Sequence, residues 1–425
     1  MSITAGKIAE VMFEKFMETY EHQMSMLPLV DFSEPSEKDM QNTGNIIWRP
    51  IQQSRPIIPG WDLTGNEQNI IEETYPAVLG TPNNDLVRQR ADDMRDMRFW
   101  ERAAEQSGRR QATELNKDIA QAIVTQGSLF YRSNVTSGFD FIAEGQALMN
   151  ERQKVNNGRC FILNDRDSLL YAKDLASRET VKGRPESTWN TGQIGSNVAE
   201  FDVYVGSFLP NITGGADPAV TFTGNQSFKP EAGSVNATTN AVTNIDYREA
   251  SFVVNNSALV SVGDKFTIQN SAVDVQSVGL ADKTATGTAM TWTVIEIPDS
   301  THIVCYPKPI APDDATLTLL EKSYSNIDTQ ILNAATLTRL NIDASNKTNI
   351  FFDKSAIEVI GGTIPAQLFK QFDGMKVISD TMSNGLKVYM VFDGDMITMN
   401  FRYRIFTWYG ITVADPANCG VAVSY

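Results

Sequence analysis

The sequence predicts a mixed α+β fold into which an all-β domain is inserted. Residues 85–127 carry apolar side chains at steps of three or four, the spacing of one helical face. Residues 386–413 contain long runs in which apolar and polar side chains alternate, as they do in strands. Residues 213–309 are rich in Thr, Ser, Asn, Val and Ala and contain short alternating runs, which indicate a small Greek-key barrel or sandwich.

Length and composition bound the class of protein. A chain of 425 residues is too long for one ordinary core, and its 42% apolar content is typical of a folded protein. No window approaches the ~18 apolar residues of a membrane-spanning helix, and the N-terminus is too charged for a secretion signal, so we expect residence in a cytoplasm. The net charge of −15 argues against a protein that grips nucleic acid by its phosphates, although an acidic protein can surround nucleic acid without adhering to it.

The first 30 residues or so predict an amphipathic helix. Two possibilities fit this pattern: the helix docks on its own domain, or it is an arm that reaches another chain. Glu14 and Glu18 lie off the apolar stripe, one turn apart. The stripe consists of Ile8, Val11, Met12, Phe16, Met17 and Tyr20.

Residues 31–84 are punctuated by proline and glycine. Two short apolar runs, NIIWRPI and QNIIEETYPAVL, flank a turn at PGWDLTG, which predicts a long two-stranded excursion. An isolated hairpin is only marginally stable in water, so a partner surface is expected beneath it. Trp48 and Trp61 are candidate anchors on that surface, or they fill a local core.

The 85–127 segment predicts a single long helix. Asp85 is placed as an N-cap and Gly127 as a C-cap, which gives a length of roughly 60 Å at about 1.5 Å per residue. Its other faces alternate in charge, either as a solvated surface or as a strut between subunits. We expect its stripe from Trp100 to Ile123 to lie across the sheet formed by residues 386–413.

The remaining elements follow from periodicity. Helices are expected at FDFIAEGQALMNERQ, DRDSLLYAKDL and TQILNAATLTRLNI, and the first two belong to an α/β lobe. Segments 231–250 and 276–290 of the β domain lack strand character and are expected to be long loops. Strands are expected at RCFILN, FDVYVGSFLP, AVTFTG, ASFVVNN, DKFTIQN, TWTVIEI, HIVCYPK, NIFFD and AIEVIGG.

Residues for catalysis are scarce. The chain has two histidines, His22 and His302, and lacks the common nucleotide-binding, metalloprotease and hydrolase motifs. The run Asp393-Gly394-Asp395 predicts a tight turn rather than a cation site, and the three cysteines are expected to be reduced and buried. We therefore predict no catalytic, cofactor or metal site. An adhesive protein would need clustered aromatics on the β domain, for which Trp292, Tyr247 and Tyr306 are the candidates.

Several pieces, in this order along essentially the whole chain, resemble one family. They are NIIWRPIQQSRPIIPGWDLTG, NDLVRQRADDMRD, CFILNDRDSLLYAKDL, NQSFKP, GDKFTI, YPKPIAPDD and RIFTWYGITVADPANCGVAV. The chain resembles the tailed-phage major capsid proteins of the Hong-Kong-97 type, in particular the coat proteins of short-tailed Salmonella-type podoviruses with an inserted (I) domain. It departs from them in the two I-domain loops and in the polar loop around Trp189.

The resemblance implies a domain layout for this chain. The expected parts are an N-arm (1–40), an E-loop hairpin (41–82), a P-domain spine helix (83–133), an A-domain in two parts (134–212 and 339–379), an inserted β-barrel I-domain (213–338), and the P-domain return strands with the C-terminus (380–425).

The resemblance also implies a function. Such a subunit assembles in the host cytoplasm, as hexamers and pentamers, with a scaffolding protein and a portal protein. The resulting procapsid expands as double-stranded DNA is packaged, and the subunit encloses that DNA without sequence-specific binding. Neither a membrane nor a cofactor is involved, and the mature location is the virion capsid.

Three expectations about individual residues accompany this function. Glu14 and Glu18 would face a basic patch on the scaffolding protein, and Asp246, Arg248 and Glu249 would make a symmetric contact between capsomers. Some shells of this type lock covalently through a hairpin lysine, but here no lysine lies between Lys38 and Lys117. The shell is therefore expected to be held without isopeptide crosslinks.

Overall fold

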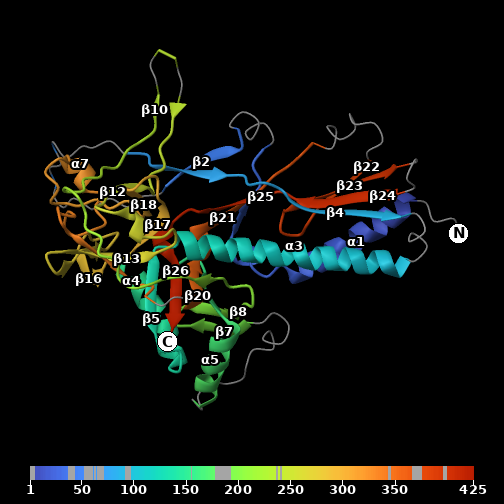
Figure 1. Cartoon of the computed structure of the whole chain (residues 1–425), viewed down its shortest axis with the longest axis horizontal. Helices are drawn as coiled ribbons and strands as arrows, with labels where there is room; N and C mark the ends of the chain where they lie inside the picture. Colours follow the sequence, from blue (N-terminus) through green and yellow to red (C-terminus); the bar gives the residue numbers. More distant parts are fainter. Residues whose placement is uncertain are drawn as a thin grey trace. The chain divides into compact units, whose positions relative to one another are not determined.

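A computed structural model of the chain describes residues 5–36, 44–51, 61, 64, 71–90, 97–154, 156–177, 193–235, 238–239, 242–342, 346–365, 376–395 and 400–425 (Figure 1). The chain forms two compact units built from interleaved segments. Unit 1 comprises Met1–Ile47, Ala77–Ile119 and Ile357–Thr412. Unit 2 comprises Trp48–Pro76, Ala120–Ala356 and Val413–Tyr425.

Unit 1 contains a four-stranded antiparallel sheet and the first part of the long helix α3 (Met97–Gln126). Trp100 of α3 is fully buried, and its ring meets those of Phe401 and Tyr403 edge-on, with centroids 5.8 and 6.0 Å away. At Trp100 the helix thus packs its apolar stripe on the sheet, as the sequence predicts. The sheet order is β22 (Lys376–Thr381), β23 (Lys387–Asp395), β24 (Asn400–Thr407), β4 (Asn83–Arg90).

The predicted start of the long helix at Asp85 is wrong. Residues 83–90 form β4, whose side chains alternate between half-buried and exposed and which pairs along its whole length with β24. The alternation of NDLVRQR fits the sheet edge, and this pairing overrides the run of helix-forming residues. Since α3 has 30 residues, it is about 45 Å long at ~1.5 Å per residue.

Helix α1 (Ala5–Gln23) docks on its own unit, which decides between the two possibilities for the terminal helix. Met12, Phe16 and Tyr20 have no exposed surface. A Cβ added at Gly108 of α3 would lie 3.0 Å from the carbonyl oxygen of Phe16, so the two helices approach closely there. Asn116 of α3 then accepts from the backbone N–H of Met26 at 3.1 Å, just beyond the end of α1.

A second, three-stranded sheet completes unit 1. After the short helix η1 (Leu27–Leu29), β1 (Asp31–Ser33) pairs in parallel with β21 (Ile357–Gly361), which lies beside β25 (Tyr409–Val413). The hydroxyl of Tyr409 donates to the Asp118 carboxylate at 2.7 Å, which connects this sheet to α3.

Unit 2 holds the predicted α/β lobe. Helices α4 (Gly138–Glu151) and α5 (Asp165–Ser177) accompany a mixed sheet of seven strands, and Tyr131, Phe161 and Phe351 form an aromatic cluster in the lobe core. The sheet order is β5 (Leu129–Ser133), β26 (Cys419–Ser424), β20 (Asn346–Asp353), β6 (Arg159–Leu163), β8 (Phe201–Val205), β7 (Gln193–Val198), with β9 (Asn211–Ile212) beside β20.

The same unit contains a second group of strands within residues 234–339, called the β domain below, whose core includes Phe252, Phe266 and Trp292. In Figure 1, β10 and β11 extend away from the other strands of this domain. The main sheet runs β12 (Ala250–Val253), β18 (His302–Tyr306), β17 (Trp292–Glu296), β13 (Lys265–Asn270), β14 (Val273–Asp274), with β19 (Thr336–Arg339) also on β13. Two further pairs are β10 (Ser234–Val235) with β11 (Val242–Thr243), and β15 (Gln276–Val278) with β16 (Ala285–Ala289).

Four local predictions are wrong. The expected helix at TQILNAATLTRLNI is absent because residues 336–339 pair with β13 and bury Leu337. AVTFTG makes only isolated bridges, whereas the two predicted loops of the β domain each contain a short strand pair. Asp393-Gly394-Asp395 lies within β23 instead of forming a turn, and Asp393 pairs with Arg402 at 3.3 Å across to β24.

Candidate functional site

Glu14 and Glu18 both lie exposed on α1, away from its buried stripe. The Lys15 ammonium donates to Glu18 Oε2 at 2.7 Å, and this hydrogen bond lowers the pKa of the Glu18 carboxyl. Glu18 and Lys15 thus form an exposed ion pair, and such pairs contribute little to stability. Both carboxylates are placed where a second protein can reach them.

The predicted hairpin begins with β2 (Ile46–Pro50) and ends with β3 (Thr74–Val78), which pair with each other. Trp48 on β2 is half-buried, whereas Trp61 is fully exposed. Residues 52–60, 62–63 and 65–70 lie outside the described part of the chain, and most of the predicted hairpin tip falls there. An indole with its whole surface in water is a large apolar area available for contact.

The three charges predicted for a contact between capsomers have different environments. Arg248 is buried, and it donates to both carboxylate oxygens of Asp246 at 2.7 and 3.0 Å. Its guanidinium carbon lies 5.3 Å from the ring centroid of Tyr75 and 5.0 Å from that of Tyr306. Arg248 and Asp246 therefore satisfy each other within the chain, and only Glu249 is exposed.

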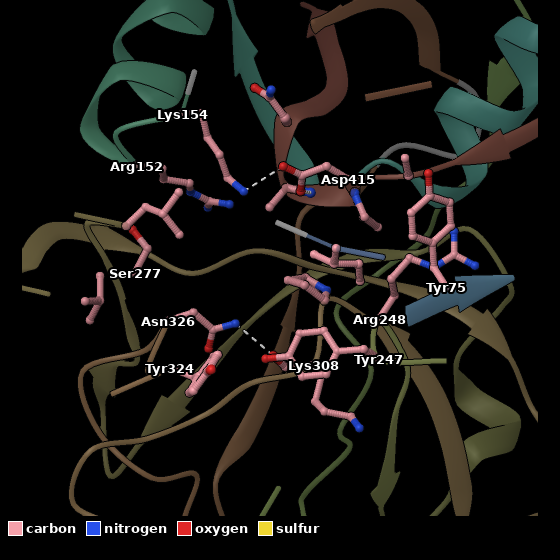
Figure 2. Close-up of a pocket in the computed structure, with 18 of the residues that line it drawn as sticks. Tyr75, Arg152, Lys154, Tyr247, Arg248, Ser277, Lys308, Tyr324, Asn326 and Asp415 are labelled. Carbon is pink, nitrogen blue, oxygen red and sulfur yellow. Dashed lines mark hydrogen bonds and ion pairs between the residues drawn. The ribbon is translucent and has the colours of Figure 1, made fainter. Parts of the chain in front are cut away.

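Unit 2 also contains a pocket of about 380 Å³ (Figure 2). Its walls come from the hairpin base, the end of α4, the β domain and residues 414–418. Sequence reasoning missed this site because its residues belong to well-separated segments and form no motif. The residues used below are Arg152, Lys154, Lys283, Lys308 and Asp415.

Arg152 is the most unusual residue of this pocket. Its side chain follows the last turn of α4 and is only 4% exposed. Nη2 donates to the hydroxyl of Thr291 at 3.1 Å, but Nε and Nη1 have no hydrogen-bond partner among the residues that the structure describes. Burial lowers the pKa of Arg152 to about 10. The charges of Glu151 and Asp415 oppose this lowering, but neither carboxylate forms an ion pair with the guanidinium among the described residues, and a desolvated arginine without an ion pair is costly.

Two lysines add positive charge to the pocket. Lys154 pairs with Asp415 at 2.8 Å. Among the described residues, the one hydrogen bond of the Lys283 ammonium is to the backbone oxygen of Ser325, at 3.1 Å. Burial, and secondarily the charge of Lys154, lowers the pKa of Lys283 to about 8. Glu73, directly before β3 in the hairpin base, is buried, and burial raises its pKa to about 9, so at neutral pH it adds no negative charge.

The metal-ligand candidates and the thiols of the described residues can be assessed directly. Within them, no group of three or more His, Cys, Asp or Glu side chains could hold a metal ion. All three cysteines are free and buried, as predicted, and burial raises the pKa of Cys160 and of Cys419 to about 12. These thiols are therefore protonated and poorly nucleophilic at neutral pH.

The adhesive alternative loses its aromatic candidates. Trp292 has no exposed surface, and Tyr247 and Tyr306 are only 8% and 4% exposed. A carbohydrate-binding face needs exposed rings, so these three cannot provide one.

In the described part of the chain, no helix is both long enough and apolar enough to span a membrane.

Comparison with known proteins gives a family match over nearly the whole chain. The family model described as "P22 coat protein - gene protein 5" matches residues 1–424. Three solved structures with some likeness are the capsid of the cyanophage P-SCSP1u (10% identity, 93% of this chain and 86% of that chain, TM-score 0.44), the capsid of a native GTA particle (8%, 95% and 90%, 0.40) and a virus-like particle from Pyrococcus furiosus (8%, 97% and 96%, 0.38).

Proposed function

Because this chain belongs to the P22 coat protein family, we propose that many copies of it assemble with a scaffolding protein and a portal protein into an icosahedral procapsid. The chain is a phage coat protein, that is, a structural subunit of the head and not an enzyme. The procapsid then expands as double-stranded DNA enters. The observation that carries the proposal is the family match from residue 1 to residue 424.

The domain layout of the Hong-Kong-97 type accommodates the observed elements. We place the spine helix at α3, the P-domain sheet at β22, β23, β24 and β4, the A-domain at the α/β lobe, and the I-domain at the β12–β18 sheet. The E-loop corresponds to the segment between β2 and β3. The N-arm contains α1, whose apolar face is covered by its own unit.

Apolar surface on the single chain supports assembly. Unit 1 has a groove of about 480 Å³ along β4, β23 and β24, in which Leu86 is 71% exposed. Such exposed apolar surface is unfavourable on a lone chain and is stabilised when a neighbouring copy covers it. A shell in which every copy covers its neighbours is then stable by mass action.

Electron microscopy of the coat protein co-expressed with its scaffolding protein tests the proposal. We expect uniform closed shells, and we expect soluble monomers when the coat protein is kept dilute without scaffolding protein. A preparation that forms only small defined oligomers under both conditions would contradict an icosahedral subunit.

The surface of α1 is our candidate for scaffold contact. Reversing both charges, Glu14→Lys with Glu18→Lys, is expected to lower the yield of scaffold-dependent shells and to change its salt dependence, because attraction to a basic patch becomes repulsion. The matched control is Asp140→Lys with Glu144→Lys on α4, which are likewise exposed and four residues apart. Equal shell yield and scaffold content in both double variants would refute the assignment.

We propose that the segment 231–250, which contains β10 and β11, reaches between capsomers. Since Arg248 is satisfied by Asp246, Glu249 is the charge we expect to act in this contact. Glu249→Lys should slow assembly and leave the unfolding of the monomer within ~0.5 kcal/mol of the unmodified protein, as for other surface changes. Light scattering reports assembly and chemical denaturation reports stability; Glu296→Lys on β17, also exposed, is the control. Unchanged assembly kinetics for Glu249→Lys would argue against the contact.

We propose that the mature shell has no covalent lock at the hairpin. An isopeptide bond needs an amine, and no lysine lies between Lys38 and Lys117, while the guanidinium groups of Arg49 and Arg55 stay protonated. Burial of ~400 Å² of apolar surface beneath each hairpin, anchored by Trp48 and Trp61, would offer on the order of 10 kcal/mol at ~25 cal/mol per Å² before entropy costs. Mature shells boiled in detergent under reducing conditions should run as single chains of 47.0 kDa. A ladder of covalent multimers would show the opposite.

A further inference from the structure

The pocket of unit 2 is lined by basic side chains, although the chain as a whole is acidic. The whole chain has a net charge of −15, yet Arg152, Lys154 and Lys283 line this pocket, and within the described residues only Lys154 forms an ion pair with a carboxylate, that of Asp415. These three cations and Asp415 leave two positive charges, without counting Lys308, which also lines the pocket. The pocket's other arginine, Arg248, is neutralised by Asp246 and does not add to this excess.

Of the three cations counted here, Arg152 and Lys283 are the two without an ion pair among the described residues. Figure 2 shows the guanidinium of Arg152 and the ammonium of Lys154 on the same side of the pocket, both directed toward its interior. Lys308 differs, because its ammonium points away from Arg152 and Lys154 in that view and lies 5.3 Å from the ring centroid of Tyr247. Arg152 and Lys283 form no ion pair within the described residues.

From this arrangement we propose that the pocket binds a small divalent oxyanion of the phosphate type, held by Arg152, Lys154 and Lys283. Two negative charges match the excess of two cations. Nε and Nη1 of Arg152 supply N–H donors that no described group uses, and both lysines can turn a further N–H toward the anion. The volume of about 380 Å³ admits a phosphate with several waters or a small phosphate ester.

The ligand would join three parts of unit 2. Arg152 and Lys154 follow α4 of the α/β lobe, Lys283 lies between β15 and β16 of the β domain, and Ile51 and Tyr75 of the hairpin base complete the wall. Binding to the folded state alone must stabilise it, so the melting temperature should rise with ligand concentration. This inference does not depend on the proposed assembly with scaffolding and portal proteins.

Isothermal titration calorimetry of the full chain with inorganic phosphate, at fixed ionic strength in a phosphate-free buffer, tests the site. We expect saturable binding to one site per chain. Lys283→Met should weaken it by at least about ten-fold, because a charge-assisted hydrogen bond is lost. Asp415→Asn should tighten binding several-fold, because it removes the competing carboxylate and keeps the Oδ1 that accepts from the backbone of Ala417. Lys229→Met, at an exposed lysine outside the pocket, should leave the affinity unchanged.

Lys283→Met and Asp415→Asn are expected to change the phosphate affinity in opposite directions, which a general loss of structure would not do. Arg152→Gln should also abolish binding, and if that variant fails to fold, Lys283→Met and Asp415→Asn still decide. No saturable phosphate binding by the unmodified chain, or equal affinity in Lys283→Met, would overturn the proposal. A short DNA duplex that binds through Lys283 and that phosphate does not displace would overturn it as well, since the site would then take a nucleic-acid backbone instead of a free anion.

Discussion

Replacing Trp100 with alanine is expected to destabilise unit 1 by about 3–5 kcal/mol, the range measured for buried aromatic side chains that are truncated to alanine. The indole is 1% exposed, and it meets Phe401 of β24 at a centroid distance of 5.8 Å and Tyr403 at 6.0 Å. Its Nε1 has no hydrogen-bond partner among the described residues, so the loss is one of packing alone.

Phe99 is the matched control for this prediction. It is the neighbouring aromatic residue on α3 but is 41% exposed, so Phe99→Ala should cost less than about 1 kcal/mol. Chemical denaturation of the monomer, followed by circular dichroism, measures both variants. If Trp100→Ala and Phe99→Ala lost the same stability, α3 would not be held on the sheet through Trp100.

The segment predicted as one long helix, residues 85–127, shows how much of this fold the sequence predicts. The stripe from Trp100 to Ile123 has a helical period, and the structure buries it as predicted. Residues 83–90 contain helix-forming side chains, but their polar and apolar residues also alternate as in a strand. They form a strand because they pair with β24. The period of the apolar residues identifies the buried face of a helix or strand. It does not reveal that a strand 310 or more residues further along the chain will pair with the segment.

The candidate site residues also divide into those that local sequence can predict and those whose environment depends on distant parts of the chain. Glu14, Glu18 and Glu249 are exposed, and sequence reasoning could place them because surface charges depend on local period alone. Arg248 was predicted as a contact residue, but its local sequence gives no sign of Tyr75 and Tyr306, between which it is buried. The phosphate-type pocket could not be predicted at all, because its cations come together only when unit 2 has folded.

Lys265 is expected to make the stability of unit 2 depend on pH. This lysine of β13 has no exposed surface, and its ammonium donates to the backbone oxygen of Gly127, at the end of α3, and to the hydroxyl of Thr293 at 2.8 Å. Burial lowers its pKa to about 7, against the opposing effects of Cys419 and Asp264. The amine keeps two N–H donors when it loses its proton, so both contacts can persist.

The direction of the effect follows from proton linkage. The folded pKa is about 7 and the ordinary value is 10.5, so between these the unfolded chain binds the additional proton, and stability rises as pH rises. Between pH ~7 and ~9.5 the gain from this one residue is about 3 kcal/mol, at about 1.36 kcal/mol per pH unit. Lys265→Met removes the titrating group and should remove this gain.

The measurement is the free energy of unfolding of the unmodified protein and of Lys265→Met at several pH values between ~7 and ~9.5. Their difference isolates Lys265, because every other titrating group is common to both proteins. Lys229→Met, which removes an exposed lysine from the same unit, should run parallel to the unmodified protein. A constant difference between Lys265→Met and the unmodified protein across this range would mean that Lys265 stays charged in the folded state, held by the Gly127 and Thr293 oxygens at the end of α3.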